Sequence, residues 1–309
     1  MKKIKALEIS NLYKEYFINA KKSSFKALRN ISFSVEKGSI VAILGPNGAG
    51  KSSLINILAG TVNKSSGKVK INGFDIEKNE REAKLSIGVV PQELVIDPYF
   101  TPRETLNFQS GYYGIKKSKF LTEDLLSKLR LKDKANAYVR NLSGGMKRRL
   151  MIAKAMVHSP PILILDEPTA GVDVSLRQIL WKNIRELNKN GTTVIITTHY
   201  LEEAESLCKE AVFVNKGRVV LIGKIKDLIK KIDKKILSIN LSNKLTKIPK
   251  ILGKEGFYLK NQNTLKISYK PSDVSAGSLI TKVNSCKLKI KDVITQEARL
   301  EDLFEELTK

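Results

Sequence analysis

The sequence predicts an α/β fold, in which helices cover a parallel sheet, followed by a second, smaller α/β domain. Short apolar runs alternate with helical patterns in the first part of the 309-residue chain, and this alternation is typical of a parallel sheet. After about residue 225 the glycine motifs stop and lysines become denser. We therefore expect one domain over residues 1–225 and an accessory domain over residues 226–309.

Five segments of the first domain predict particular elements. Alternating apolar residues over 31–35 predict a strand, and the continuous apolar run over 40–44 predicts a buried one. A helix is expected over 54–58, after a glycine-rich segment. The runs over 162–165 and 194–198 predict two more buried strands, each followed by polar residues. Because ligands of such sheets bind at the carboxyl ends of the strands, we expect the functional site there.

Helical patterns and turn signals predict the remaining elements of this domain. Residues 93–145 indicate a helical insertion between two halves of the sheet. Residues 101–104 read Thr-Pro-Arg-Glu, a capping box with proline at the first helical position. Residues 211–222 predict a β-hairpin around the Asn-Lys-Gly turn at 215–217.

The second domain shows weaker patterns. Alternating residues over 236–241 and 265–269 predict two strands, and the end of the chain predicts an amphipathic helix. One face of that helix carries the apolar residues Leu300, Leu303, Phe304 and Leu307. We expect a small α/β domain of the ferredoxin-like type.

Composition limits the classes of function without choosing one. The formal net charge of +24 fits a nucleic-acid or anionic-membrane partner. Lysines are scattered and far outnumber arginines, however, so we favour solvated faces over a nucleic-acid surface. No apolar run approaches the roughly 18 residues of a membrane span, and the start of the chain does not resemble a signal peptide. Cys208 and Cys286 lack metal-like spacing, and we expect reduced thiols in a cytosolic chain.

A phosphate-binding loop is the most specific motif. Residues 45–52 fit G-x-x-x-x-G-K-S directly between a predicted strand and a predicted helix, which is the context that the motif requires. Lys51 can reach the β- and γ-phosphates of a nucleotide, and the Ser52 hydroxyl can bind Mg²⁺. The candidate phosphate-binding residues are Gly45, Pro46, Asn47, Gly48, Ala49, Gly50, Lys51, Ser52 and Ser53.

Polar residues that follow two other predicted strands complete a candidate hydrolytic site. Asp166 and Glu167 end the run ILILDE, and such a pair of carboxylates is unfavourable as mere structure unless a cation lies there. We expect Asp166 to hold Mg²⁺ and Glu167 to orient or deprotonate the attacking water. His199 follows the run VIITT, where it can contact the γ-phosphate. His158 lies at a predicted helix exit and is interpreted as structural.

Three further candidates have weaker signals. Gln92 follows an apolar run and can contact Mg²⁺ and water. Tyr16, or alternatively Phe17, could stack on a nucleotide base. A second helix start, in the stretch NLSGGMKRRL, offers backbone N–H groups to an anion. Its candidate anion-binding residues are Ser143, Gly144 and Gly145.

These motifs together resemble the ATP-binding subunit of an ABC transporter. GPNGAGKSS, Gln92, LSGGM, ILILDEP, TAGVD and TTHY occur in one order over about residues 4–225. The resemblance implies an ABC-type P-loop NTPase domain that binds ATP and Mg²⁺, with Asp173 at the nucleotide site. It implies two subunits, identical or paralogous, stacked head to tail. The Ser143 segment of one chain would then contact the ATP held by the phosphate loop of the other, so that one triphosphate occupies both helix starts.

The motifs DEPTAGVD and TTHYLEEAE, with the C-terminal extension, resemble the branch that exports drugs, lipids or polysaccharides. That branch implies a separate integral membrane permease, gripped by the surface near Gln92, and a location on the cytoplasmic face of the membrane. No nucleic-acid partner is expected. The sequence departs from the family at Met146, where glutamine is usual, and at Ser53, where threonine is usual. Residues 19–25 also indicate a longer loop than usual next to Tyr16.

Two other functions are weighed against transport. A non-transport ABC ATPase acting on nucleic acid or ribosomes fits the positive charge, but the chain has one ATPase unit and no sustained heptads. A P-loop kinase that phosphorylates a small molecule would leave Ser143, Gly144 and Gly145 unexplained.

Overall fold

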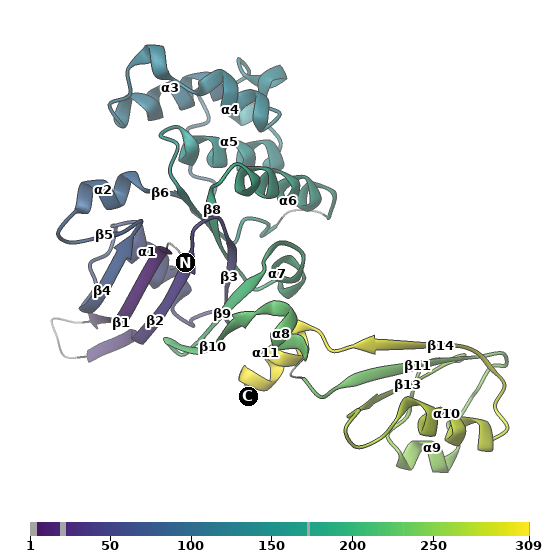
Figure 1. Ribbon diagram of the computed structural model, residues 1–309. Coiled ribbons are helices and arrows are strands. Elements are labelled where there is room, and N and C mark those ends of the chain that lie inside the picture. Colours follow the sequence, from purple (N-terminus) through teal and green to yellow (C-terminus); the bar gives the residue numbers. More distant parts are fainter. Residues whose placement is uncertain (1–4, 19–22, 172–173, 231, 309) are drawn as a thin grey trace. The chain divides into compact units, whose positions relative to one another are not determined.

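The computed structural model describes residues 5–18, 23–171, 174–230 and 232–308. The chain divides into two compact units, Met1–Lys224 and Ile225–Lys309 (Figure 1). Among the described residues, no helix combines the length and the apolar character needed to cross a membrane.

A six-stranded sheet forms the centre of the first unit. Its strand order is β10-β9-β3-β8-β7-β6, and all neighbouring pairs from β9 to β6 are parallel. The strands are β3 (Ile40–Leu44), β6 (Ile87–Val90), β7 (Ile162–Asp166), β8 (Thr193–Thr198), β9 (Glu210–Asn215) and β10 (Arg218–Lys224). Every residue of β3 and β8 is buried, which is why these segments read as continuous apolar runs. The predicted parallel sheet is confirmed.

Strands β9 and β10 form the predicted hairpin and pair antiparallel. Lys216 and Gly217 connect them with φ angles of 47° and 74°. Two consecutive left-handed residues characterise the tight turn that matches the twist of a hairpin. The turn also supports the phosphate loop, because the Gly217 N–H donates to the Ala49 carbonyl at 2.9 Å.

A four-stranded antiparallel sheet, which the sequence did not predict, lies beside this core (Figure 1). Its order is β2-β1-β4-β5, with β1 (Lys5–Ile18), β2 (Ser23–Glu36), β4 (Ser66–Ile71) and β5 (Phe74–Asp75). The strand predicted over 31–35 is confirmed, and it lies within the longer strand β2. The expectation of a loop over 19–25 was wrong for residues 23–25, because β2 begins at Ser23 and pairs with β1 from its first residue. Residues 19–22 lie outside the described residues. Register shifts along β1, including one near Asn11 at φ 50°, break the alternation that would have revealed the strand.

Helix α1 (Lys51–Leu58) packs into a core shared by both sheets. Leu54, Ile55, Ile57 and Leu58 are all buried there, together with apolar residues of β1, β2, β3 and β4. Outside the helical insertion, the first unit also contains α2 (Glu80–Leu85), α6 (Val174–Lys189) and α7 (Leu201–Leu207). The helix that follows the phosphate loop is therefore held on several sides.

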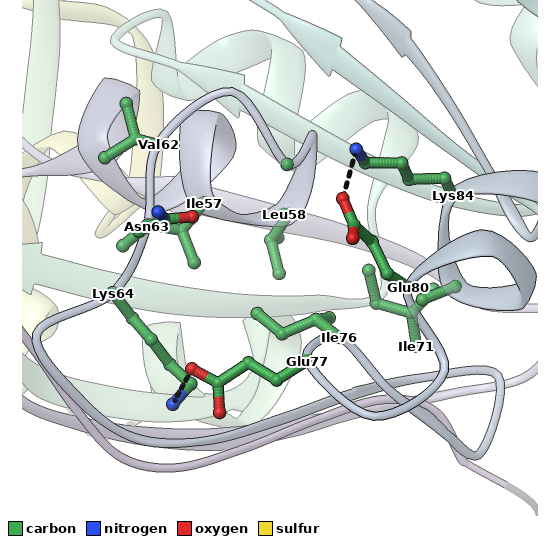
Figure 2. A pocket seen from close by; sticks show the side chains of 12 residues that line it. Ile57, Leu58, Val62, Asn63, Lys64, Ile71, Ile76, Glu77, Glu80 and Lys84 are labelled. Atoms are coloured by element: carbon green, nitrogen blue, oxygen red, sulfur yellow. Dashed lines mark hydrogen bonds and ion pairs between the residues drawn. The ribbon is translucent and has the colours of Figure 1, made fainter.

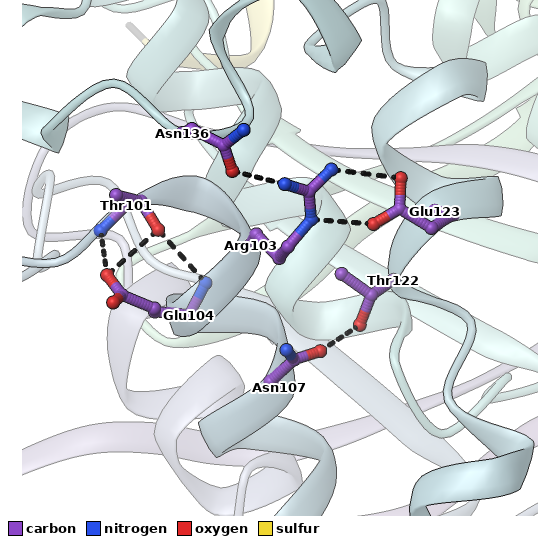
Figure 3. A network of polar contacts seen from close by, with 7 residues as sticks. All are labelled: Thr101, Arg103, Glu104, Asn107, Thr122, Glu123 and Asn136. Carbon is purple, nitrogen blue, oxygen red and sulfur yellow. Dashed lines mark hydrogen bonds and ion pairs between the residues drawn. The ribbon is translucent and has the colours of Figure 1, made fainter.

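The predicted helical insertion contains α3 (Pro102–Tyr112) and α4 (Thr122–Lys128), and α5 (Gly144–Met156) follows it. The capping box is confirmed: the Glu104 N–H donates to Thr101 Oγ1 at 3.2 Å, and the Thr101 N–H donates to Glu104 Oε2 at 2.8 Å. Arg103 joins α3 to α4 through Glu123, at 2.7 and 3.2 Å, and also bonds Asn136 (Figure 3). These contacts fix the two helices against each other.

The second unit has the strand order β12-β13-β11-β14, and all its pairs are antiparallel. Its elements are α8 (Ile225–Lys230), β11 (Lys235–Leu241), α9 (Lys250–Lys254), β12 (Tyr258–Asn261), β13 (Thr264–Tyr269), α10 (Ala276–Ser285), β14 (Ile290–Glu297) and α11 (Leu300–Thr308). From β11 to β14 this is the β-α-β-β-α-β connection of the ferredoxin-like type that the sequence suggested. Leu237, Ile239, Leu265, Leu279 and Val283 form its separate core.

Candidate active site

The carboxyl ends of the central strands surround a cavity of about 480 Å³ in the first unit. It is lined by the phosphate loop after β3, by Gln92 after β6, by Glu167 after β7 and by His199 after β8. The lining residues of the loop are Asn47, Gly48, Ala49, Gly50, Lys51, Ser52 and Ser53. Residues far apart in the sequence thus meet where a parallel sheet is expected to bind its ligand.

Two glycines allow the phosphate loop to pass close to neighbouring backbone. A Cβ on Gly45 would lie 2.2 Å from the Val214 carbonyl oxygen, and one on Gly50 would lie 2.6 Å from that of Ala27. Gly50 also has φ 105°, a conformation that costs other residues free energy. It directly precedes α1, so these contacts fix the helix start at Lys51.

Lys51 is buried and turned toward its own loop. Its Nζ donates to the carbonyl oxygens of Gly45 at 2.7 Å and Pro46 at 3.2 Å. Burial lowers the pKa of Lys51, and the nearby carboxylates of Glu167 and Asp166 oppose that shift. The ammonium group therefore lies inside the curve of the loop, where a phosphate would meet it.

Asp166 and Glu167 form a close acidic pair held by β8. The Thr197 hydroxyl donates to Asp166 Oδ1, and the Glu167 N–H donates to the Thr197 carbonyl at 3.0 Å. Burial raises the pKa of Asp166, the Thr197 bond lowers it, and the negative charge of Glu167 raises it further. A cation beside Asp166 would remove this electrostatic penalty.

Glu167 has an unusual backbone for a residue with a side chain, with φ 44°. Such conformations are costly and persist where the surrounding structure imposes them, often at functional sites. Only 8% of Glu167 is exposed, and its Oε2 lies 3.1 Å from His199 Nδ1. The strained turn thus brings the carboxylate into the cavity beside the imidazole of the neighbouring strand.

Arg148 on α5 connects the helical region to the Gln92 segment. Its Nη1 donates to the Pro91 carbonyl at 2.9 Å, and its Nη2 donates to the Gln92 carbonyl at 2.8 Å. Only 4% of Arg148 is exposed, so both bonds form away from water. The sequence analysis missed this residue because charged residues in a basic helix read as solvated.

We expect Arg148→Met to lower the turnover number for ATP by about ten- to a hundredfold, because Gln92 would lose its anchored position. Nucleotide affinity of the isolated chain should change little, since Arg148 does not line the cavity. Arg149→Met is the matched control: Arg149 Nη1 also donates to backbone carbonyls, those of Leu129 and Arg130, at 2.8 and 3.0 Å. Equal losses of turnover in both variants would contradict the role of Arg148.

The Ser143 segment does not contribute to this cavity. Ser143 caps α5, and its Oγ accepts from the Met146 N–H at 3.3 Å. Ser143, Gly144 and Gly145 are absent from the described residues that line the cavity. The first turn of α5 carries no acidic side chain, so its N–H groups remain suited to an anion.

The aromatic residue that lines the cavity is Phe25, which the sequence analysis did not select. Phe25 is 52% exposed and pairs with Tyr16 across β2 and β1. Tyr16 points its hydroxyl at Ser53 Oγ, 3.3 Å away, and Lys14 Nζ lies 4.5 Å from the centre of its ring. Phe17 is 62% exposed and does not line the cavity.

Two other predicted residues have different outcomes. Asp173 lies outside the described residues. His158 stacks on Tyr113 at 3.9 Å, its Nε2 lies 3.2 Å from the Ile87 carbonyl oxygen, and burial lowers its pKa. These contacts agree with a structural histidine.

A second cavity, of about 460 Å³, lies between α1, β4, β5 and α2 (Figure 2). Two lysines on its rim are neutralised locally: Lys64 Nζ lies 2.8 Å from Glu77 Oε1, and Lys84 Nζ lies 2.6 Å from Glu80 Oε1. It contains none of the residues predicted to bind phosphate or water. The candidate site is therefore the cavity at the strand ends.

A phosphate loop between a parallel strand and a helix, with an acidic residue ending another strand of the same sheet, defines a P-loop nucleoside triphosphatase. The family model described as ABC transporter matches residues 28–170. The Nod factor export ATP-binding protein I of Rhizobium etli is 40% identical over 226 residues, which are 72% of this chain and 70% of that protein. The chain belongs to the family of ABC transporter ATP-binding subunits. It is accordingly an ATP-binding protein and an ATPase, as the motifs predicted.

Other comparisons agree. The linearmycin resistance ATP-binding protein LnrL of Bacillus subtilis is 39% identical over 224 residues, covering 72% of this chain and 70% of that one. Among solved structures, an ATP-binding subunit of an ABC transporter is 28% identical with a TM-score of 0.64, over 73% of this chain and 92% of that chain. A dimeric ATP-binding cassette bound to ADP and Pi is 25% identical with a TM-score of 0.63, over 71% and 98%.

Proposed function

We propose that this chain is the energy-coupling ATPase subunit of an ABC exporter, acting at the cytoplasmic face of a membrane. The observation that carries the proposal is the convergence of Lys51, Glu167 and His199 on one cavity in a chain whose relatives are named for export and for drug resistance. The alternative, an ATPase acting on nucleic acid or ribosomes, has no support among these relatives.

The side chains around the cavity suit hydrolysis of the γ-phosphate bond. Glu167 would orient and deprotonate the attacking water, and His199, whose Nδ1 lies 3.1 Å from Glu167 Oε2, would contact both water and phosphate. Lys51 would bind the β- and γ-phosphates after leaving the carbonyls of its own loop.

Oxygen ligands near the acidic pair fit Mg²⁺. Asp166 would supply one carboxylate, Ser52 a hydroxyl and Gln92 an amide oxygen, and Mg²⁺ prefers few protein carboxylates when phosphates complete its shell. Bound there, the ion would neutralise charge on the phosphates.

Ser143, Gly144 and Gly145 would act in a second chain. They do not line the cavity of their own chain, yet they form a helix start suited to an anion. In a head-to-tail dimer, one chain's phosphate loop and the other's Ser143 segment would hold the same ATP, so that hydrolysis releases the interface. The dimeric cassette with ADP and Pi supports this arrangement.

A surface of exposed apolar residues would bind the membrane permease. Tyr99, Phe100, Phe108 and Tyr112 are exposed by 70, 39, 51 and 86%, and the last three line a hollow of about 230 Å³. Soluble proteins rarely expose so many large apolar side chains together unless a partner covers them. The patch begins a few residues after Gln92, so the partner would act on the segment that enters the active site.

Affinity purification of the tagged chain from gently solubilised native membranes tests this proposal. We expect a near-stoichiometric polytopic membrane protein, and we expect Phe108→Ser to lower its yield about tenfold or more. Ile251→Ser is the matched control, because Ile251 is 62% exposed but lies in the second unit. Recovery of ribosomes or nucleic acid without a membrane protein would contradict the exporter assignment.

A further inference from the structure

We propose that strand β14 pairs with β14 of a second copy of this chain, so that the two C-terminal units form one continuous antiparallel sheet. β14 is the terminal strand of its sheet, and the described residues provide β11 as its only partner strand. An eight-residue edge strand exposes backbone groups that readily pair with another strand. The inference goes beyond the proposed function, because this pairing requires no nucleotide.

The direction of the backbone groups limits how two copies could pair. Successive residues of β11 point their backbone N–H and C=O groups alternately toward β13 and toward β14. The Leu241 N–H donates to the carbonyl of Asn263, next to β13, at 2.7 Å. The residues of β11 that bond β14 are therefore Asn240, Ser238 and Ile236. The residues of β14 bonded to β11 are then Asp292, Ile294 and Gln296. The N–H and C=O groups of Val293, Thr295 and Glu297 face outward, and the Val293 N–H donates to its neighbour Asp292 Oδ1 at 2.8 Å.

One two-fold register matches every side chain with a suitable partner. In an antiparallel ladder, a residue whose backbone groups face the partner strand must lie opposite a residue of the same kind. A two-fold axis at Ile294 meets this requirement, because it places Val293 of one chain opposite Thr295 of the other. That axis also places Ile294 opposite its own copy. Beyond these, Gln296 would donate to Asp292, and Lys291 would face Glu297.

Neighbouring registers are less favourable. A two-fold axis at Thr295 would place the apolar Val293 opposite the charged Glu297 and the apolar Ile294 opposite the polar Gln296. An axis at Val293 would place the charged Asp292 opposite the apolar Ile294. The match of apolar with apolar residues, together with the pair Lys291 and Glu297, therefore favours the register centred on Ile294.

The exposure of the side chains agrees with an uncovered interface. Ile294 is 46% exposed, which is unusual for isoleucine in the middle of a strand. Glu297 lies 3.4 Å from Lys235 of its own chain, but its side chain remains 78% exposed and can contact a second lysine. The pairing of β14 with β11 passes from Asp292 directly to Ile290, so Lys291 between them has no partner residue on β11. Lys291 is also exposed.

Cysteine cross-linking of the full chain tests the register directly. In a Cys286→Ser background without nucleotide, we expect Ile294→Cys to form a disulfide-linked dimer under mild oxidation, because facing residues of this kind have Cα atoms about 4.5 Å apart. Tyr258→Cys is the matched control, since Tyr258 is 50% exposed on β12, the opposite edge of the same sheet. Equal cross-linking of the two variants would overturn the proposal.

Charge reversal provides a second test. Lys291→Glu and Glu297→Lys should each lower the rate of Ile294→Cys cross-linking by about tenfold, and the double variant should restore it. A double variant as slow as the singles would also overturn the register. Because these experiments contain no ATP, they give their answer independently of whether the chain forms the nucleotide-dependent dimer.

Discussion

Glu167→Gln is expected to bind ATP but to lower its hydrolysis by about 10²- to 10⁴-fold, the usual contribution of a positioned general base. Glutamine keeps the size of the side chain and its contact with His199, but it cannot accept a proton from water. The Glu167 backbone, at φ 44° and bonded to Thr197, should hold either side chain in the same place. Phosphate release measured under saturating ATP provides the test.

The same substitution should also trap the dimer. If hydrolysis releases the head-to-tail interface, a chain that binds ATP without cleaving it should keep that interface closed. In the Lys291→Glu background, which weakens the pairing through β14, the variant should elute as a stable dimer with ATP and as a monomer without it. Glu77→Gln is a control, because Glu77 is an exposed acid that is paired with Lys64 and does not line the cavity of the phosphate loop. Hydrolysis by Glu167→Gln at the wild-type rate would contradict the role assigned to Glu167.

Ser143→Arg is expected to abolish hydrolysis while the monomer still binds ATP. A long cation at the start of α5 would displace the second chain's ATP from the Ser143 segment, and it would leave the chain's own cavity at the strand ends intact because Ser143 does not line it. We expect turnover to fall by about a hundredfold or more, as for loss of a group that contacts the reacting phosphate. Nucleotide affinity and turnover should be measured on the same preparation.

Loss of the helix cap needs a control of its own, since removing such a cap costs about 1 kcal/mol of stability. Ser275, which caps α10 in the second unit, provides this control. Its Oγ accepts from the Ser278 N–H at 3.2 Å, and the Ser143 Oγ accepts from the Met146 N–H at 3.3 Å in the same way. Ser275→Arg should therefore reproduce the cost in stability without the loss of hydrolysis. A similar loss of turnover in both variants would mean that Ser143 acts only through the cap.

Much of the fold could be predicted because burial leaves a simple pattern. Strands such as β3 and β8 are buried throughout, and the turn at Lys216 and Gly217 requires residues that accept positive φ. The antiparallel sheet could not be recognised in the same way. Register shifts interrupt its long strand β1, so that apolar residues no longer alternate regularly with polar ones along the sequence. The positions of these shifts are visible only in the pairing of β1 with β2 and β4.

The active site shows the same division. Glu167, His199 and Gln92 were identified because each follows an apolar run, and Lys51 was identified from its glycine-rich loop. All four line one cavity. Thr197 and Arg148 were not identified, because a threonine in a strand and an arginine in a basic helix are ordinary in sequence. Their roles arise from contacts with Asp166, Glu167 and the carbonyls of Pro91 and Gln92, which only folding brings together.

In the proposed dimer, one ATP lies between the phosphate loop of one chain and Ser143 of another. Mixing the inactive variants Lys51→Ala and Ser143→Arg tests this arrangement most directly. In a mixed dimer, one site combines the intact phosphate loop of the Ser143→Arg chain with the intact Ser143 of the Lys51→Ala chain. Random pairing should restore roughly a quarter of wild-type hydrolysis, since half of the dimers are mixed and each has one intact site. A mixture no more active than its two components would contradict the shared site.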